Sequence, residues 1–169
     1  MVDQVINFFG FEIIIPVEFK QLLIAAIIGF IIGIDRAIRE KIASLRTFSM
    51  ISTGSCLFTI LSIKSTGAAE SHVDVSRIAA QIVTGIGFLG GGVIFKTTDR
   101  VEGVTTAAMI WLTAALGMCC GYNQIGLVVW AFGLGAFIHL LSTWAHKAID
   151  FINRKKKSSS EQLEDSGMA

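Results

Sequence analysis

The hydrophobic positions of the chain gather into five long runs, separated by short polar or glycine-containing segments. A run of about 20 mostly apolar residues, with a range of about 17–25, can cross the hydrocarbon core of a bilayer as a helix. The five runs meet this length and cover residues 17–36, 45–63, 77–95, 104–122 and 124–144. The pattern predicts an all-α fold, namely a polytopic membrane helix bundle of five transmembrane helices.

The run within residues 74–95 is apolar enough to span a bilayer, yet the segment holds five glycines. At about 100° per residue, small side chains spaced 4, 3 and 4 residues apart form one narrow stripe. Helices in hydrocarbon associate by close packing, which small residues permit. We expect this run to be the central helix, with another helix pressed against the stripe; the alternative is that its glycines only mark flexibility. The stripe is Ala80, Thr84, Gly87 and Gly91, and the predicted helix-packing set also includes Gly29, Gly33, Gly85 and Gly90.

Basic residues are distributed unevenly between the two ends of the predicted helices. With five alternating spans, 11 of the 14 Lys and Arg residues lie on one side and 3 on the other. Cytoplasmic loops carry such an excess, so the N-terminus is expected outside and the C-terminus in the cytoplasm. Residues 1–150 then form the transmembrane domain, and the basic, polar segment 151–169 is predicted to be a disordered cytoplasmic tail.

Charged residues cluster at the end of the first run. In a continuing helix, Asp35 faces Arg39 and Arg36 faces Glu40, both at i, i+4 spacing. Arg46 begins the next run only about ten residues later, and charges at membrane depth normally face a partner or a cavity. Two interpretations stay open: a buried cluster of Asp35, Arg36 and Arg46, or a solvated helix end.

Polar residues also mark the starts of the third and fourth runs. Asp74 is a candidate helix cap, because a short polar side chain can accept bonds from unpaired backbone N–H groups. Arg77 and Gln81, at i, i+4 spacing, instead suggest a polar face that runs into the bundle. Thr105 and Thr106 open the fourth run in the manner of a capping turn. In the second run, the hydroxyl stripe of Ser52, Ser55, Thr59 and Ser62 either joins helices or lines a water path.

The sequence contains none of the common catalytic signatures. We find no nucleophile with a matching base, no phosphate loop ending in Lys-Ser/Thr, and no His/Cys/acid cluster at metal spacing. A net charge of +1 gives no strongly basic surface for nucleic acid. We therefore expect no enzyme activity, no metal, no cofactor and no nucleic-acid partner.

Four sequence blocks resemble the MgtC/SapB family of bacterial inner-membrane proteins. They are GIDR at 33–36, LRT at 45–47, the glycine-rich segment 74–94, and GVTTAA at 103–108 with Trp111 and Gly117 after it, so that the likeness covers residues 29–122. The chain departs from the family pattern at four places: Asp35 where Glu is usual, Ser44 and Phe48 where Gly and His are usual, and Gly91 where Ala is usual.

The resemblance implies a multi-pass protein of the bacterial inner membrane, linked to growth at low magnesium, to acid stress and, in some pathogens, to virulence. It does not imply magnesium transport. It implies regulation of a membrane complex such as the ATP synthase, and this chain is expected to lack the C-terminal cytoplasmic domain of the best-known member.

Two functions are compatible with these features. The first is a non-enzymatic regulator in the lipid bilayer, expected to be a homo-oligomer, whose glycine-rich helix packs against itself or a larger complex. The alternative is a small ion or solute transporter with an intramembrane pathway lined by Asp35, Arg36, Arg46, Asp74, Arg77 and Gln81.

Overall fold

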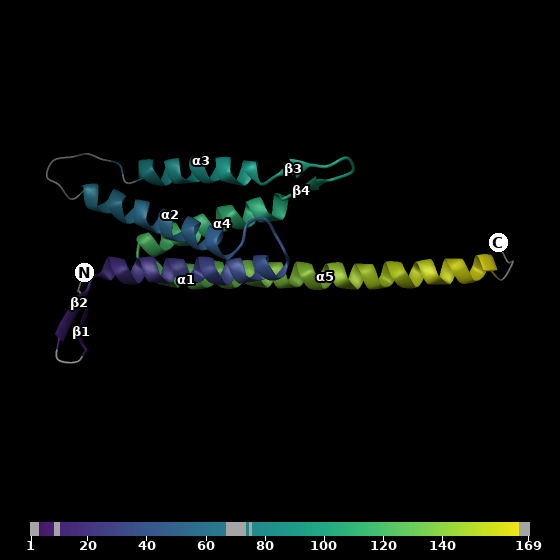
Figure 1. Ribbon diagram of the computed structural model, residues 1–169, viewed down its shortest axis with the longest axis horizontal. Coiled ribbons are helices and arrows are strands. Elements are labelled where there is room, and N and C mark those ends of the chain that lie inside the picture. The colour runs from purple at the N-terminus through teal and green to yellow at the C-terminus, as the bar shows by residue number, and fades with distance from the viewer. Residues whose placement is uncertain (1–3, 9–10, 67–73, 75, 166–169) are drawn as a thin grey trace. The chain divides into compact units, whose positions relative to one another are not determined.

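The computed structural model describes residues 4–8, 11–66, 74 and 76–165, in which helices predominate (Figure 1). The chain divides into two compact units, residues 1–128 and 129–169. The helices are α1 (Val17–Ile38), α2 (Leu45–Thr66), α3 (Ser76–Gly92), α4 (Val104–Gly121) and α5 (Ile125–Asp165). The short strands are β1 (Gln4–Phe8), β2 (Phe11–Ile15), β3 (Phe95–Lys96) and β4 (Val101–Glu102), paired antiparallel as β1 with β2 and β3 with β4.

Helix α2 is the centre of the first unit, because it packs against both α1 and α4. Two glycines of α1 allow the first contact. A Cβ atom on Gly29 would overlap the carbonyl oxygen of Phe48, and one on Gly33 would lie 2.5 Å from the Cα atom of Leu45. The backbones of α1 and α2 therefore approach as closely as backbones without side chains permit.

The second contact joins α2 to α4 through Gly117 and Gly121. A Cβ atom on Gly117 would overlap the carbonyl oxygen of Ser52, and one on Gly121 would lie 2.6 Å from the Cβ atom of Thr59. The hydroxyl stripe of α2 thus faces α4. Ser52, Ser55, Thr59 and Ser62 are all buried, so the stripe lies at a helix contact in this unit.

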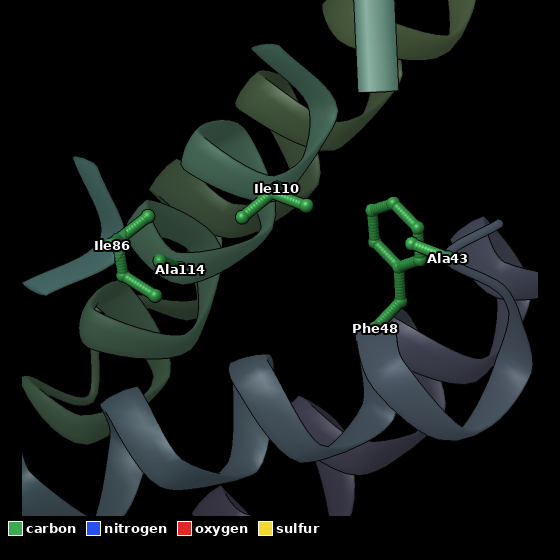
Figure 2. Close-up of a cluster of buried hydrophobic side chains, with 5 residues drawn as sticks. All are labelled: Ala43, Phe48, Ile86, Ile110 and Ala114. Atoms are coloured by element: carbon green, nitrogen blue, oxygen red, sulfur yellow. The ribbon is translucent and has the colours of Figure 1, made fainter. Parts of the chain in front are cut away.

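A small apolar cluster of buried side chains also joins the helices of this unit. It consists of Ala43, Phe48, Ile86, Ile110 and Ala114, drawn from the α1–α2 turn, α2, α3 and α4 (Figure 2). Phe48 is fully buried, with 0% of its surface exposed. The phenylalanine that replaces the histidine usual in the resembled family is therefore a core residue here.

Helix α3 is not the central helix, which corrects the prediction from its glycine content. It runs alongside α2 and α4 and leads into β3 and β4 (Figure 1), and only Ile86 and Gly90 among its described residues are buried. That another helix packs against the stripe of α3 stays a prediction. The glycine spacing cannot tell whether that helix belongs to the same chain.

Within the described residues, three helical segments are long and apolar enough to cross a membrane: Val17–Ile38, Val104–Gly121 and Ile125–Arg154. Helix α2 is less apolar, since nine of its 22 residues are Ser or Thr. Helix α3 has 17 residues, at the short end of the range of about 17–25 that spans a bilayer. Five spans and the N-outside orientation therefore stay predictions.

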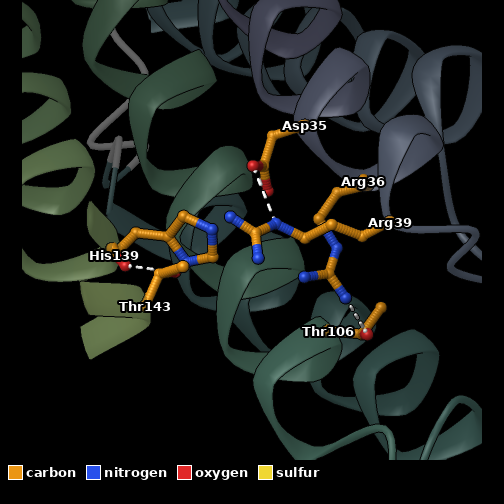
Figure 3. Close-up of polar contacts among 6 residues, drawn as sticks. All are labelled: Asp35, Arg36, Arg39, Thr106, His139 and Thr143. Carbon is orange, nitrogen blue, oxygen red and sulfur yellow. Dashed lines mark hydrogen bonds and ion pairs between the residues drawn. The ribbon is translucent and has the colours of Figure 1, made fainter. Parts of the chain in front are cut away.

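The second unit consists of α5 from residue 129 onward. Within it, the hydroxyl of Thr143 donates a hydrogen bond to the carbonyl of His139 at 2.9 Å (Figure 3). The helix continues to Asp165, whereas the sequence predicted a disordered tail from residue 151. Lys, Glu, Gln and Leu in this segment are good helix formers, which gives a local reason for the continuation. Residues 166–169 of the predicted tail lie outside the described residues.

We predict that Gly117→Ala destabilises the protein by about 1–3 kcal/mol, because the added methyl group must displace the backbone of Ser52. The matched control is Gly126→Ala, where a Cβ atom would meet nothing within 4 Å. Thermal unfolding in detergent should show a lower midpoint for the first variant only. Equal midpoints for the two variants would contradict the close α2–α4 contact.

Candidate functional site

The end of α1 is shaped by a tight turn that fixes the position of Arg36. Glu40 has a positive φ of 53°, and the backbone N–H of Lys41 donates to the carbonyl of Arg36 at 3.0 Å. The N–H of Glu40 donates to the carbonyl of Ala37 at 3.1 Å. This pair of bonds is the Schellman motif, which closes the last turn of a helix. The chain then reverses towards α2.

Arg36 is buried, with 3% of its surface exposed, and its side chain crosses to α4. Its Nη2 atom donates a hydrogen bond of 2.6 Å to Oγ1 of Thr106, in the first turn of α4 (Figure 3). Thr106 is 6% exposed. Among the described residues, Nε of Arg36 has no hydrogen-bond partner. A contact between α1 and α4 thus rests on one buried cation and a neutral hydroxyl.

Asp35 and Arg39 form an ion pair beside this contact. Nε of Arg39 lies 2.9 Å from Oδ1 of Asp35, at the predicted i, i+4 spacing (Figure 3). Both side chains are about one-third exposed, at 35% and 36%, and pairs of this kind contribute on the order of 0–1 kcal/mol. Arg46 is exposed and lies outside the contact. Arg36 therefore makes its described hydrogen bond to Thr106, whereas Asp35 pairs with Arg39.

A glycine turn places Thr106 opposite Arg36. Gly103 precedes α4 with φ of +88°, and a Cβ atom there would overlap the carbonyl oxygen of Val93. Only glycine suits a site with both a left-handed backbone and no space for a side chain. As a result, α4 begins without a side-chain cap. Thr105 is exposed while Thr106 is buried, so the two threonines lie on different faces.

The predicted cluster at the start of α3 lies on the surface. Asp74, Arg77 and Gln81 are exposed, and the backbone N–H of Arg77 donates to the carbonyl of Asp74 at 3.1 Å. Gln81 borders an apolar groove of about 550 Å³ between α2 and α3, whose other walls include Gly54, Phe58 and Gly85. The sequence does not predict this groove, because Gly54 and Gly85 lie in different apolar runs and no spacing relates them.

The small residues of α3 divide between two faces. A Cβ atom on Gly85, Gly87 or Gly91 would meet nothing within 4 Å, whereas one on Gly90 would lie 3.7 Å from the Cβ atom of Ala107. Ala80 and Thr84 are exposed, and the Thr84 hydroxyl bonds to the carbonyl of Ala80 at 3.0 Å. The stripe Ala80, Thr84, Gly87 and Gly91 therefore faces away from the rest of the described unit, and we call it the α3 small-residue face.

In the described part of the chain, no group of three His, Cys, Asp or Glu residues is placed so that it could hold a metal ion. Cys56, Cys119 and Cys120 are free, and Cys56 and Cys120 are buried. The described arrangement offers helix-packing surfaces and one buried cation.

Apolar helices joined through glycine contacts define a helical membrane protein. Comparison with known proteins gives the family. The chain belongs to the MgtC family, whose sequence profile matches residues 22–148. No solved structure matches the chain.

Individual relatives support the same assignment. The chain is 42% identical to Protein MgtC of Salmonella typhimurium over 104 residues, which cover 62% of this chain and 43% of that protein. It is 37% identical to an uncharacterised protein of Synechocystis over 142 residues, or 83% of this chain and 57% of that protein. An uncharacterised protein of Haemophilus influenzae is 40% identical over 112 residues, covering 61% and 46% respectively. The chain spans about half the length of these curated relatives.

We predict that Thr106→Val destabilises the protein by about 1–3 kcal/mol, because it removes the acceptor of a buried guanidinium without changing side-chain size. The control is Thr105→Val, which alters an exposed neighbour and should cost less than about 0.5 kcal/mol. The midpoint of thermal unfolding distinguishes them. If both variants unfold at the wild-type temperature, the Arg36 contact does not support the fold.

Proposed function

We propose that this chain is a non-enzymatic integral protein of the bacterial inner membrane that regulates a larger membrane complex. Regulation operates through the α3 small-residue face, which packs against a transmembrane helix of the partner. The single observation that carries the proposal is the open space in front of Gly87 and Gly91.

The contrast among the glycines supports this assignment. Backbone or side-chain atoms of the same chain occupy the space in front of Gly29, Gly33, Gly117 and Gly121. Gly87 and Gly91 form an equivalent surface that no described residue covers. In a bilayer, exposed apolar residues have no reason to associate, but a face of small residues lets a second helix approach and gain packing contacts.

Family membership supplies the physiological setting of the proposal. Relatives of the chain carry the name MgtC, and the resemblance implies adaptation to low magnesium or acid stress. We propose the proton-translocating ATP synthase as the regulated complex and homo-oligomer formation through the same or a neighbouring surface.

The transport alternative receives less support from the described residues. Arg36 contacts the first turn of α4, and α4 follows the C-terminal end of α3 in the chain. Arg77 lies at the N-terminal end of α3, which is about 22 Å from its C-terminal end at a rise of 1.5 Å per residue. Arg46 is exposed on α2, and Arg77 and Gln81 are exposed on α3. The large groove beside Gln81 has mostly apolar walls. These residues therefore do not line one shared polar cavity.

We predict that Gly87→Leu with Gly91→Leu abolishes regulation while the protein still folds, because both glycines face open space. Inverted membrane vesicles report ATP-driven proton pumping directly. Wild-type protein should lower pumping, and the double variant should restore it, with recovery of ATP synthase subunits on the purified protein reduced about tenfold, or about 1.4 kcal/mol.

The matched control is Gly126→Leu, which adds the same side chain at another open position and should leave inhibition intact. Thermal unfolding must be unchanged in both proteins for the comparison to hold. Inhibition of pumping by a folded double variant, equal to that of wild type, would refute the proposed surface.

A further inference from the structure

We propose that the first turn of α4, together with Arg36, binds a phosphate group, carried either by an anionic lipid or by inorganic phosphate. The site lies between α1 and α4 and does not involve the α3 small-residue face. The phosphate site can therefore be tested independently of the regulatory function proposed above.

Arg36 supplies a buried positive charge that forms no ion pair among the described residues, although the carboxylate of the adjacent Asp35 attracts it electrostatically. It is 97% buried, given its 3% exposure, and its described hydrogen bond goes to the neutral hydroxyl of Thr106. Asp35, the adjacent residue, pairs with Arg39 instead. Burial of a charge is costly unless ion pairs and hydrogen bonds compensate it. The free Nε atom leaves at least one donor for such an anion.

The first turn of α4 supplies a second set of donors. The first N–H groups of any helix lack acceptors within the helix, and here these belong to Val104, Thr105 and Thr106. The residue before them is Gly103, which provides no side-chain cap. Its backbone conformation and the carbonyl of Val93 exclude a Ser, Thr or Asp at this position. An external anion is thus the natural acceptor for these groups.

The two sets of donors meet at one residue. Thr106 belongs to the first turn of α4, and its Oγ1 atom lies 2.6 Å from Nη2 of Arg36 (Figure 3). Val104 and Thr105 are exposed, so an anion can approach the helix end from outside while Arg36 contacts the same turn from inside. A helix terminus combined with a guanidinium is a strong phosphate-binding arrangement.

Charge in the neighbouring turn favours the same class of ligand. Residues 35–46 hold four basic and two acidic side chains, a net charge of +2. Basic pockets between helix ends near the membrane surface suit anionic lipid headgroups. Inorganic phosphate presents the same oxygen atoms, so the experiment must separate the two sources.

Hydrogen exchange of the backbone N–H groups at 104–106 tests the proposal directly, because bound phosphate would protect them. The full chain is placed in phosphatidylcholine nanodiscs, in matched nanodiscs that also contain phosphatidylglycerol, and in phosphatidylcholine nanodiscs with inorganic phosphate. Chloride at equal ionic strength is the reference. At a ligand concentration about ten times its Kd, exchange should slow about tenfold.

Two variants remove the site by different routes. Arg36→Gln removes the buried charge, and its matched control is Arg39→Gln, which removes an exposed charge from the same helix end. Thr105→Asp places a carboxylate in the first turn of α4, which favours the helix but repels phosphate. Its charge-matched control is Gln124→Asp, at the other end of α4. Thr105 is exposed, so we expect Thr105→Asp to preserve the fold, and it decides the matter if Arg36→Gln does not fold.

Protection by phosphatidylglycerol alone would identify a lipid headgroup, and protection by inorganic phosphate in phosphatidylcholine would identify the free ion. Either result, lost in Arg36→Gln and Thr105→Asp and retained in both controls, supports the site. Unchanged exchange in every medium overturns it, as does protection that survives in Thr105→Asp.

Discussion

The close approach of two helix backbones to α2 is the contact on which the rest of the first unit depends. Gly29 and Gly33 bring α1 against residues 45–49 of α2, and Gly117 and Gly121 bring α4 against residues 52–59. Side chains larger than hydrogen would separate these helices. Since apolar side chains gain little by leaving lipid, tight packing and hydrogen bonds must supply the association energy. Substitution of glycine at these contacts therefore acts on the fold, whereas substitution on α3 acts on an open surface.

The same contacts bring the polar residues of the α1–α4 junction together. Close packing at Gly33 brings α1 alongside the start of α2, and the turn at Glu40 closes the end of α1. Gly103 then sets the first turn of α4 so that Thr106 receives the hydrogen bond of Arg36. The buried cation is consequently a product of helix packing. Neither α1 nor α4 could retain it in apolar surroundings without the other.

Much of this fold is present in the sequence pattern, because apolar runs and short turns fix helix boundaries. The predicted runs 17–36 and 104–122 agree closely with α1 (Val17–Ile38) and α4 (Val104–Gly121). The sequence pattern does not predict how each helix is rotated about its own axis. Spacing alone could not show that Arg36 is buried while Arg46 is exposed, or that the glycines of α3 face outward. These differences depend on which neighbour each helix meets, which is information about tertiary packing and not about periodicity.

We propose that the chain uses one set of glycines to fold and presents another to a partner. Cysteine labelling with a membrane-permeant maleimide tests it most directly, in protein whose native Cys56, Cys119 and Cys120 are replaced by Ala. A cysteine at position 84 or 91 should react fully in purified protein and become protected in native membranes, while the buried Cys120, kept as the sole cysteine of a matched protein, should stay unreactive in both. Equal reactivity of positions 84 and 91 in purified protein and native membranes would contradict the account.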